Sequence, residues 1–275
     1  MGRREFVGLS VTAGLAAGAA WEVVEKDVTI RTPDGNCDAA WIHPKIGSHA
    51  GVLIWPDAFG LRPAMREIGK RLSEQGYAVV IPNPFYRISK APFKDASGFD
   101  FSNPADMAKL QPLMASVNAP GNAEKDAAAY VTFLDDQKEV NLTRNIGTQG
   151  YCMGGPLVVR TAAALPGRIG AGASFHGGGL VTANPTSPHL LAPKIKARMY
   201  FGIAQSDDAK QPDAKDKLKA AFAAAKVHTG IEVYPAQHGW CIPDMPSSGG
   251  TPIYNKEEAE KAWVKLLALY RAALS

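Results

Sequence analysis

The chain has 275 residues, of which 46% are hydrophobic and 20% are charged, and its formal net charge is +4. This length is sufficient for one large α/β domain with a substantial hydrophobic core. The basic residues are scattered and do not alternate with aromatic residues along one stripe, so nucleic acid is excluded as an expected partner.

Residues 1–20 have the pattern of a Tat-type export signal. Arg3 and Arg4 form a twin-arginine pair, and roughly 14 small or apolar residues follow and end at Ala17–Ala20. Such a run is too short to cross a bilayer of about 30 Å, so we expect no stable membrane anchor. The pattern predicts an exported, periplasmic protein. The alternative is a cytoplasmic protein with a frayed N-terminal helix.

Beyond this segment, short apolar runs alternate with segments of helical periodicity. An antiparallel hairpin is expected over residues 23–42. The strands expected after it are Gly51–Trp55, Tyr77–Ile81, Arg144–Gln149, Gly170–Phe175, Arg198–Ile203 and Ile231–Pro235. The expected helices are Pro63–Gln75, Ala123–Gln137, Gly154–Ala164, Asp213–Lys226 and Lys256–Leu274. The long segment Asn83–Gly121 has a weak pattern and predicts a cap or lid with a little helix.

The expected strands are apolar on both sides, which is typical of a parallel sheet buried between helices. Together with the strand–helix alternation, this predicts a three-layer α/β fold whose mostly parallel central sheet carries helices on both faces. No repeat and no linker divides residues 21–275, so we expect one domain.

Cys152 lies in the pattern of a nucleophile elbow, with cysteine where serine is commoner. The pattern is Gly150–Gly154, which follows an expected strand and precedes an apolar helix. Glycines are required because the chain turns sharply from strand to helix around the nucleophile. The pattern therefore predicts Cys152 as the nucleophile. A small buried cysteine on a strand–helix turn is the alternative.

Two candidate partners follow later strands, so they are expected at the same carboxyl edge of the sheet, where ligands of open α/β sheets bind. Asp207 comes after the strand Arg198–Ile203, and His238 comes after Ile231–Pro235. The order nucleophile, acid, histidine is that of α/β hydrolases. Asp208 is an alternative acid, because no spacing rule separates adjacent residues.

The remaining histidines fit the role of base less well. His176 ends an expected strand but precedes both aspartates, so we expect it to be a rim or substrate contact, or a structural histidine. The others lie in turns or polar surroundings and are expected at the surface; they are His43, His49, His189 and His228.

The loop after the first buried strand is expected to complete the site. It normally supplies one oxyanion N–H group, and the residue after the nucleophile supplies the other, so the backbones of Ala58 and Met153 are the candidates. Asp57 is either a carboxylate near the nucleophile or a turn aspartate. Side chains that would wall a substrate pocket, with core packing as the alternative, are Phe59, Tyr86, Tyr151, His176 and Trp240.

The sequence resembles the dienelactone hydrolase family over nearly all of residues 23–274. The matching motifs are the elbow Gly150–Gly154, Gly202 to Asp207 with Pro212–Ala214, Tyr234–Trp240, and Phe59-Gly60 with Arg66-Glu67. The resemblance implies an α/β-hydrolase fold and a Cys152–His238–Asp207 triad that cleaves an ester or lactone through a thioester acyl-enzyme. It implies a small-molecule substrate and no metal or organic cofactor.

Two positions depart from the family pattern. The glutamate that precedes the oxyanion loop and holds the thiol at rest is Asp57 here, which is one methylene shorter. The arginines that bind the dienelactone carboxylate are not evident, and Ile242 occupies one such position. A short-chain carboxylesterase acting on neutral esters is therefore an alternative, and a non-catalytic binding protein on a hydrolase scaffold is another. The sequence leaves the natural substrate and the choice between monomer and dimer open.

Overall fold

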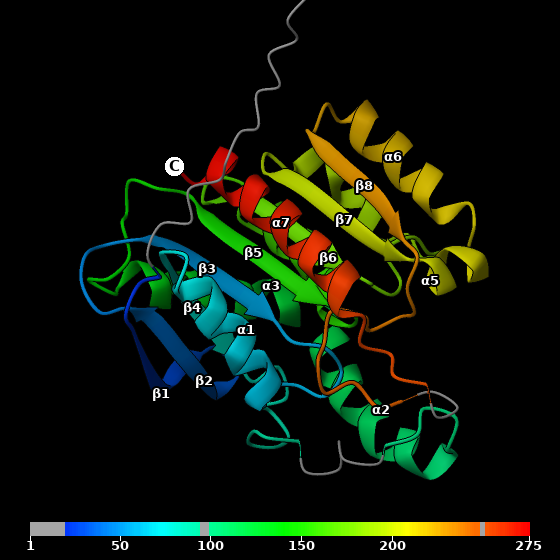
Figure 1. Ribbon diagram of the computed structural model, residues 1–275, viewed down its shortest axis with the longest axis horizontal. Coiled ribbons are helices and arrows are strands. Elements are labelled where there is room, and N and C mark those ends of the chain that lie inside the picture. The colour runs from blue at the N-terminus through cyan, green and yellow to red at the C-terminus, as the bar shows by residue number, and fades with distance from the viewer. Residues whose placement is uncertain (1–19, 94–98, 248–250) are drawn as a thin grey trace, which may run out of the picture.

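Eight strands form a single sheet in the order β1-β2-β4-β3-β5-β6-β7-β8 (Figure 1). The computed structural model describes residues 20–93, 99–247 and 251–275. The strands are β1 Val23–Thr32, β2 Gly35–Pro44, β3 Ala50–Trp55, β4 Tyr77–Pro82, β5 Ile146–Tyr151, β6 Ile169–Phe175, β7 Arg198–Ala204 and β8 Thr229–Tyr234. β1, β2 and β4 pair antiparallel, and the pairs from β4 through β3 to β8 are parallel.

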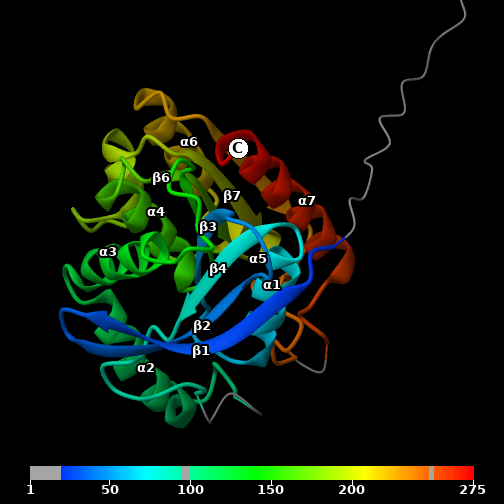
Figure 2. The same ribbon diagram turned by 90° about the vertical axis from the view of Figure 1, so that its left-hand side faces the viewer.

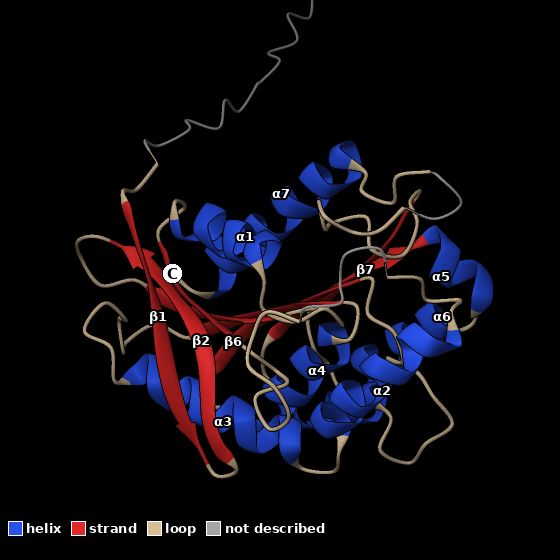
Figure 3. Cartoon of the chain, turned by 90° about the horizontal axis from the view of Figure 1, so that it is seen from below, coloured by secondary structure: helices blue, strands red, loops and turns tan. Residues whose placement is uncertain are grey.

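Helices cover both faces of this sheet. They are α1 Pro63–Ser73, α2 Pro104–Asn118, α3 Asn122–Asp135, α4 Gly154–Ala164, α5 Gln205–Lys210, α6 Ala214–Ala224 and α7 Lys256–Ala273, with a 3-10 helix at Pro188–Lys194. α1 and α7 lie on one side, and α3 and α4 lie on the other (Figures 2 and 3). The predicted three-layer α/β architecture is confirmed.

Alternation along β3 explains why this strand has only apolar or small residues. In β3, Leu53 and Trp55 belong to the core on the α3–α4 side. Val52 and Ile54 belong to the core on the α1–α7 side. Because successive side chains point to opposite faces and both faces are covered, every position must be apolar or small.

Some sequence-based expectations need correction. The segment Asn83–Gly121 contains the 15-residue helix α2, which is longer than the little helix expected. An internal proline normally ends a helix, so Pro112 made the sequence of this segment look unsuited to a long helix. Asn103 caps the helix, and the buried side chains of Leu110 and Leu113 hold it against the core. The short helix α5 and the 3-10 helix were also not expected.

Two histidines that were expected at the surface are buried. His43 is 3% exposed and lies in β2, and His49 is 7% exposed with its ring 4.9 Å from that of Trp21. Both ring nitrogens of His49 lie within hydrogen-bond distance of backbone carbonyls, those of Ile46 and Gly76. Polar neighbours in the sequence therefore did not indicate exposure.

The predicted export signal falls almost entirely on residues 1–19, which lie outside the described residues, so export stays a prediction. Within the described ranges, none of the helices combines the length and the apolar character needed to cross a membrane.

Candidate active site

Cys152 follows β5 directly and has a left-handed backbone conformation, with φ of 50°. Such a conformation is strained for a residue with a side chain, and it is typical of a nucleophile that is pushed out at a strand–helix turn. A Cβ atom at Gly150 would lie 2.3 Å from the carbonyl oxygen of Gly154. A Cβ atom at Gly154 would lie 2.3 Å from the carbonyl oxygen of Trp55. Both glycines of the elbow are therefore required by contacts with the backbone.

His238 and Asp207 meet at the carboxyl edge of the sheet. The ring N–H at Nδ1 of His238 donates a hydrogen bond to Oδ2 of Asp207 over 2.7 Å. The backbone N–H of His238 donates to Oγ of Ser206 over 2.9 Å, so adjacent residues of α5 hold both the ring and the main chain of the histidine. Asp208 instead accepts hydrogen bonds from Nζ of Lys215 at 2.8 and 2.9 Å. Of the two candidate acids, Asp207 is the one bonded to the histidine.

The surroundings of His238 favour its charged form. Burial lowers the pKa of the imidazole, but hydrogen bonds with Asp207 and with the sulfur of Cys152 outweigh this effect and raise the pKa to about 10. A carboxylate is an acceptor only, so it fixes the proton at Nδ1 and leaves Nε2 for the sulfur. The arrangement can hold an imidazolium between the carboxylate of Asp207 and the sulfur of Cys152.

His176 lies under the elbow and is only 1% exposed. Its Nδ1 accepts a hydrogen bond from the backbone N–H of Cys152 over 3.1 Å, and its ring centroid is 5.1 Å from that of His238. Burial, together with the nearby His238, lowers the pKa of His176 well below its usual range. His176 is thus a neutral acceptor that supports the Cys152 backbone, which matches the expected alternative of a structural histidine and not that of a rim contact.

The backbone N–H groups of Ala58 and Met153 are available as oxyanion donors. Neither group donates a hydrogen bond to any residue that the structure describes. Ala58 follows β3, and Met153 follows Cys152 at the start of α4, so both lie at the edge that carries the elbow. Unpaired N–H groups in such a position are what an oxyanion hole requires.

Asp57 is held by a buried arginine that the sequence analysis missed. Arg62 Nη1 and Nη2 donate to the two carboxylate oxygens of Asp57 at 2.7 and 2.9 Å, and the N–H of Phe59 donates to Oδ1 at 2.9 Å. Arg62 Nε and Nη2 also donate to the carboxylate of Asp244 at 2.9 and 2.8 Å. No hydrogen bond from Cys152 to Asp57 is found among the described residues. The bond from the Phe59 N–H group matches the alternative expectation for Asp57, that of a turn aspartate.

This Asp57–Arg62–Asp244 cluster connects the oxyanion loop to the loop that follows His238. The side chains of Asp57 and Arg62 are 1% and 5% exposed, whereas that of Asp244 is 45% exposed. Asp244 is 182 residues from Arg62 in the sequence, so no local motif could indicate the contact.

The aromatic residues that were predicted to wall a substrate pocket differ in their contacts. Phe59 packs with Phe99 and Phe101 at centroid distances of 5.2 and 5.5 Å. The hydroxyl of Tyr86 accepts a hydrogen bond from Thr32 and donates one to Asp126, so it is engaged within the protein, and a pocket role for the ring stays a prediction. Trp240 is fully buried and stacks on Tyr234.

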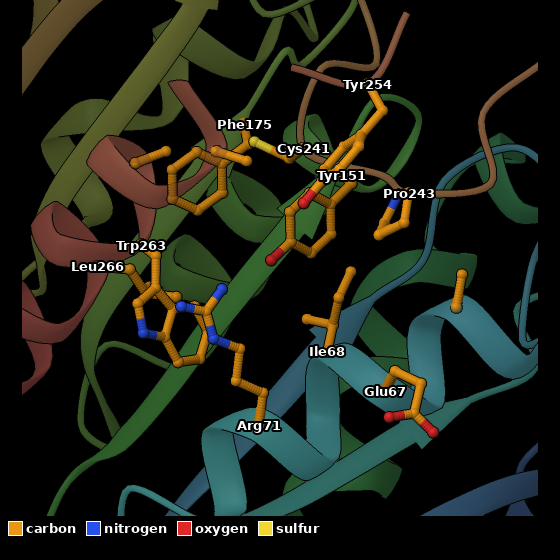
Figure 4. Close-up of a pocket in the computed structure, with 13 residues that line it drawn as sticks. Glu67, Ile68, Arg71, Tyr151, Phe175, Cys241, Pro243, Tyr254, Trp263 and Leu266 are labelled. Atoms are coloured by element: carbon orange, nitrogen blue, oxygen red, sulfur yellow. The ribbon is translucent and has the colours of Figure 1, made fainter. Parts of the chain in front are cut away.

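Tyr151 lines a pocket on the other side of the sheet, between α1 and α7 (Figure 4). Its hydroxyl accepts a hydrogen bond from Gln149 over 2.8 Å, and its ring stacks with that of Phe175. As a strand residue directly before the nucleophile, Tyr151 points to the opposite face. The prediction that Tyr151 walls the pocket of Cys152 is therefore wrong.

The sheet, its helical layers and the turn after β5 define an enzyme of the α/β-hydrolase fold, and solved structures agree. The dienelactone hydrolase from Anabaena variabilis aligns with a TM-score of 0.63 at 14% identity, covering 92% of this chain and 99% of the other. A dienelactone hydrolase-like promiscuous phosphotriesterase from metagenomic libraries aligns with a TM-score of 0.74 at 20% identity, covering 94% and 100%.

The chain belongs to the dienelactone hydrolase family, whose model matches residues 37–274. The carboxymethylenebutenolidase of Rhodococcus opacus is 30% identical over 228 residues, which cover 79% of this chain and 82% of the relative. The chain is thus a carboxylic ester hydrolase, as predicted.

The buried cluster yields a stability prediction. Arg62→Met should lower the free energy of unfolding by about 3–5 kcal/mol, because Asp57 would keep a buried charge without its partner. Arg66→Met is the matched control: Arg66 also contacts two carboxylates, but its partner Asp27 is 82% exposed, so a loss within about 1 kcal/mol is expected. Urea denaturation followed by circular dichroism measures both, and equal losses would contradict the account.

Proposed function

We propose that the protein hydrolyses esters or lactones with Cys152 as nucleophile, His238 as general base and acid, and Asp207 as the residue that orients the imidazole. The observation that carries the proposal is the left-handed backbone of Cys152 at an elbow whose sulfur helps to raise the pKa of His238. The 2.7 Å bond from His238 to Asp207 supports the same assignment.

In the first half-reaction, the thiolate of Cys152 attacks the carbonyl carbon and the carbonyl electrons move to oxygen. The N–H groups of Ala58 and Met153 stabilise this oxyanion, each by about 3 kcal/mol. The tetrahedral intermediate then collapses to a thioester, and the departing alkoxide takes a proton from Nε2 of His238.

In the second half-reaction, neutral His238 removes a proton from water while that water attacks the thioester. The carbon–sulfur bond breaks, the acid leaves, and the imidazolium–thiolate pair is restored. His176 cannot replace His238 in these steps, because its Nδ1 is engaged by the Cys152 amide and its low pKa keeps it neutral.

Neutral esters are favoured over anionic dienelactones as substrates. Arginine is the side chain best suited to bind a carboxylate specifically, through two parallel hydrogen bonds. Arg62, the buried arginine next to the oxyanion loop, already donates to the carboxylates of Asp57 and Asp244 and to the carbonyl of Gly60. Export to the periplasm remains part of the proposal and rests on the twin arginine and apolar run of residues 1–20.

Substitution of the nucleophile tests the proposal. Cys152→Ala should lower kcat for p-nitrophenyl acetate by a factor on the order of 10³ or more, with unchanged circular dichroism, because the attacking atom is lost. Cys241→Ala is the control, since Cys241 lines the pocket on the other side of the sheet and should be silent. Undiminished hydrolysis by Cys152→Ala would contradict the proposal.

The raised pKa of His238 predicts the alkaline limit of activity. The imidazolium persists up to its pKa and is lost above it, so kcat/KM, corrected for uncatalysed hydrolysis, should fall only near pH 10. Asp207→Asn removes a bond that raises this pKa, so the limb should move to lower pH and kcat should fall by on the order of 10²–10⁴.

Asp208→Asn is the matched control for this pH profile, because Asp208 is bonded to Lys215 instead of the histidine. It should leave the alkaline limb in place. If the alkaline limb moves in Asp208→Asn but not in Asp207→Asn, the assignment is contradicted and Asp208 is the acid that acts on the histidine.

A further inference from the structure

A groove begins at the His238–Asp207 pair and runs between the loop after β6 and the helices α5 and α6. Its walls are mainly apolar and include Leu180, Val181, Ile203 and Leu218. Leu180, Val181 and Leu218 are 8%, 5% and 1% exposed, so they are packed side chains that present one surface to the groove. Apolar walls that lead away from a catalytic histidine are suited to an apolar part of the substrate.

A hydrogen bond joins the two sides of the groove. Nε2 of Gln211, just after α5, donates a hydrogen bond to the carbonyl oxygen of Val181 in the opposite loop over 2.9 Å. Lys215 on α6 is bonded to Asp208 on α5. Gln211, Lys215 and Asp208 at the rim are thus engaged in hydrogen bonds within the protein.

Three successive glycines line the groove, and they differ in what requires them. A Cβ atom at Gly177 would lie 2.4 Å from Oγ of Ser174, and Gly179 has φ of 70°. A Cβ atom at Gly178 would meet no atom within 4 Å, and its φ is not in the left-handed region. Neither packing nor backbone conformation requires glycine at 178, so a larger side chain would have space at this wall of the groove.

His238 determines which half of an ester would lie in this groove. In the proposed mechanism, the histidine gives its proton to the oxygen of the departing alcohol, so that oxygen must lie next to His238. The groove includes His238 in its lining, so the substituent on that oxygen can extend from the histidine into the groove.

We propose that this groove binds the apolar alcohol moiety of the ester and that Gly178 sets the size of alcohol it accepts. The inference rests on the proposed function, because it uses His238 as the group that protonates the alcohol. Each methylene buried in the groove should increase kcat/KM by about fourfold.

The test compares two ester series: acetates of alcohols from methanol to hexanol, and methyl esters of acids from acetic to hexanoic. In the wild-type enzyme, kcat/KM should rise with alcohol length. Gly178→Leu should abolish this rise, lowering hexyl acetate hydrolysis at least tenfold while methyl acetate stays within about twofold. Gly178→Ala should fall between the two.

Gly167→Leu is the matched control. Gly167 lies in the exposed turn before β6, its Cβ atom would also meet nothing within 4 Å, and it is not among the groove residues. It should keep the wild-type dependence on alcohol length.

The inference is overturned if the wild-type enzyme does not respond to alcohol length, or if Gly178→Leu leaves that response unchanged. It is also overturned if Gly178→Leu changes the response to acid length instead. In all three cases methyl acetate is still hydrolysed through Cys152, so the proposed function stands. Failure of the proposed function would appear differently, as hydrolysis of every ester by Cys152→Ala.

Discussion

The site depends on the close approach of backbone atoms where β5 turns into α4. There the carbonyl of Trp55 on β3 and the carbonyl of Gly154 leave no space for a Cβ atom at Gly154 or Gly150. This crowding brings the first turn of α4 against the oxyanion loop and forces Cys152 into a left-handed conformation with φ of 50°. His176, at the end of the neighbouring strand, also has a positive φ, of 40°, and the packed strands maintain the strain at both residues.

The parallel strands then bring the other groups to this elbow. β6, β7 and β8 follow β5 in the sheet, and His176, Asp207 and His238 come just after their carboxyl ends. The surroundings of the two histidines shift their pKa values in opposite directions, which keeps His176 neutral and favours the charged form of His238. His176 is enclosed and serves as an acceptor for the Cys152 amide, while His238 has a carboxylate on one nitrogen. One neutral ring therefore supports the nucleophile, and one charged ring can pair with its sulfur.

Local sequence patterns were sufficient to predict the layers of the fold, the elbow and the residues that follow the parallel strands. These features depend on periodicity and on order along the chain. These patterns could not tell whether Asp207 or Asp208 is the acid bonded to the histidine. In the structure His238 is bonded to Asp207, and Lys215 is bonded to Asp208. The patterns also missed Arg62, whose partner Asp244 is 182 residues away. The side of Tyr151 was predictable, because strand alternation turns it away from its neighbour Cys152.

The central claim is that the acyl group passes through the sulfur of Cys152, and trapping that intermediate tests it most directly. With an activated ester, acylation is fast and hydrolysis of the thioester limits turnover, so the acyl-enzyme accumulates. The protein should be quenched in acid during turnover of p-nitrophenyl butyrate, digested, and analysed by mass spectrometry. One butyryl group on the peptide that contains Cys152 is the predicted result. Continued turnover with that peptide unmodified, or with the acyl group on another residue, would contradict the account.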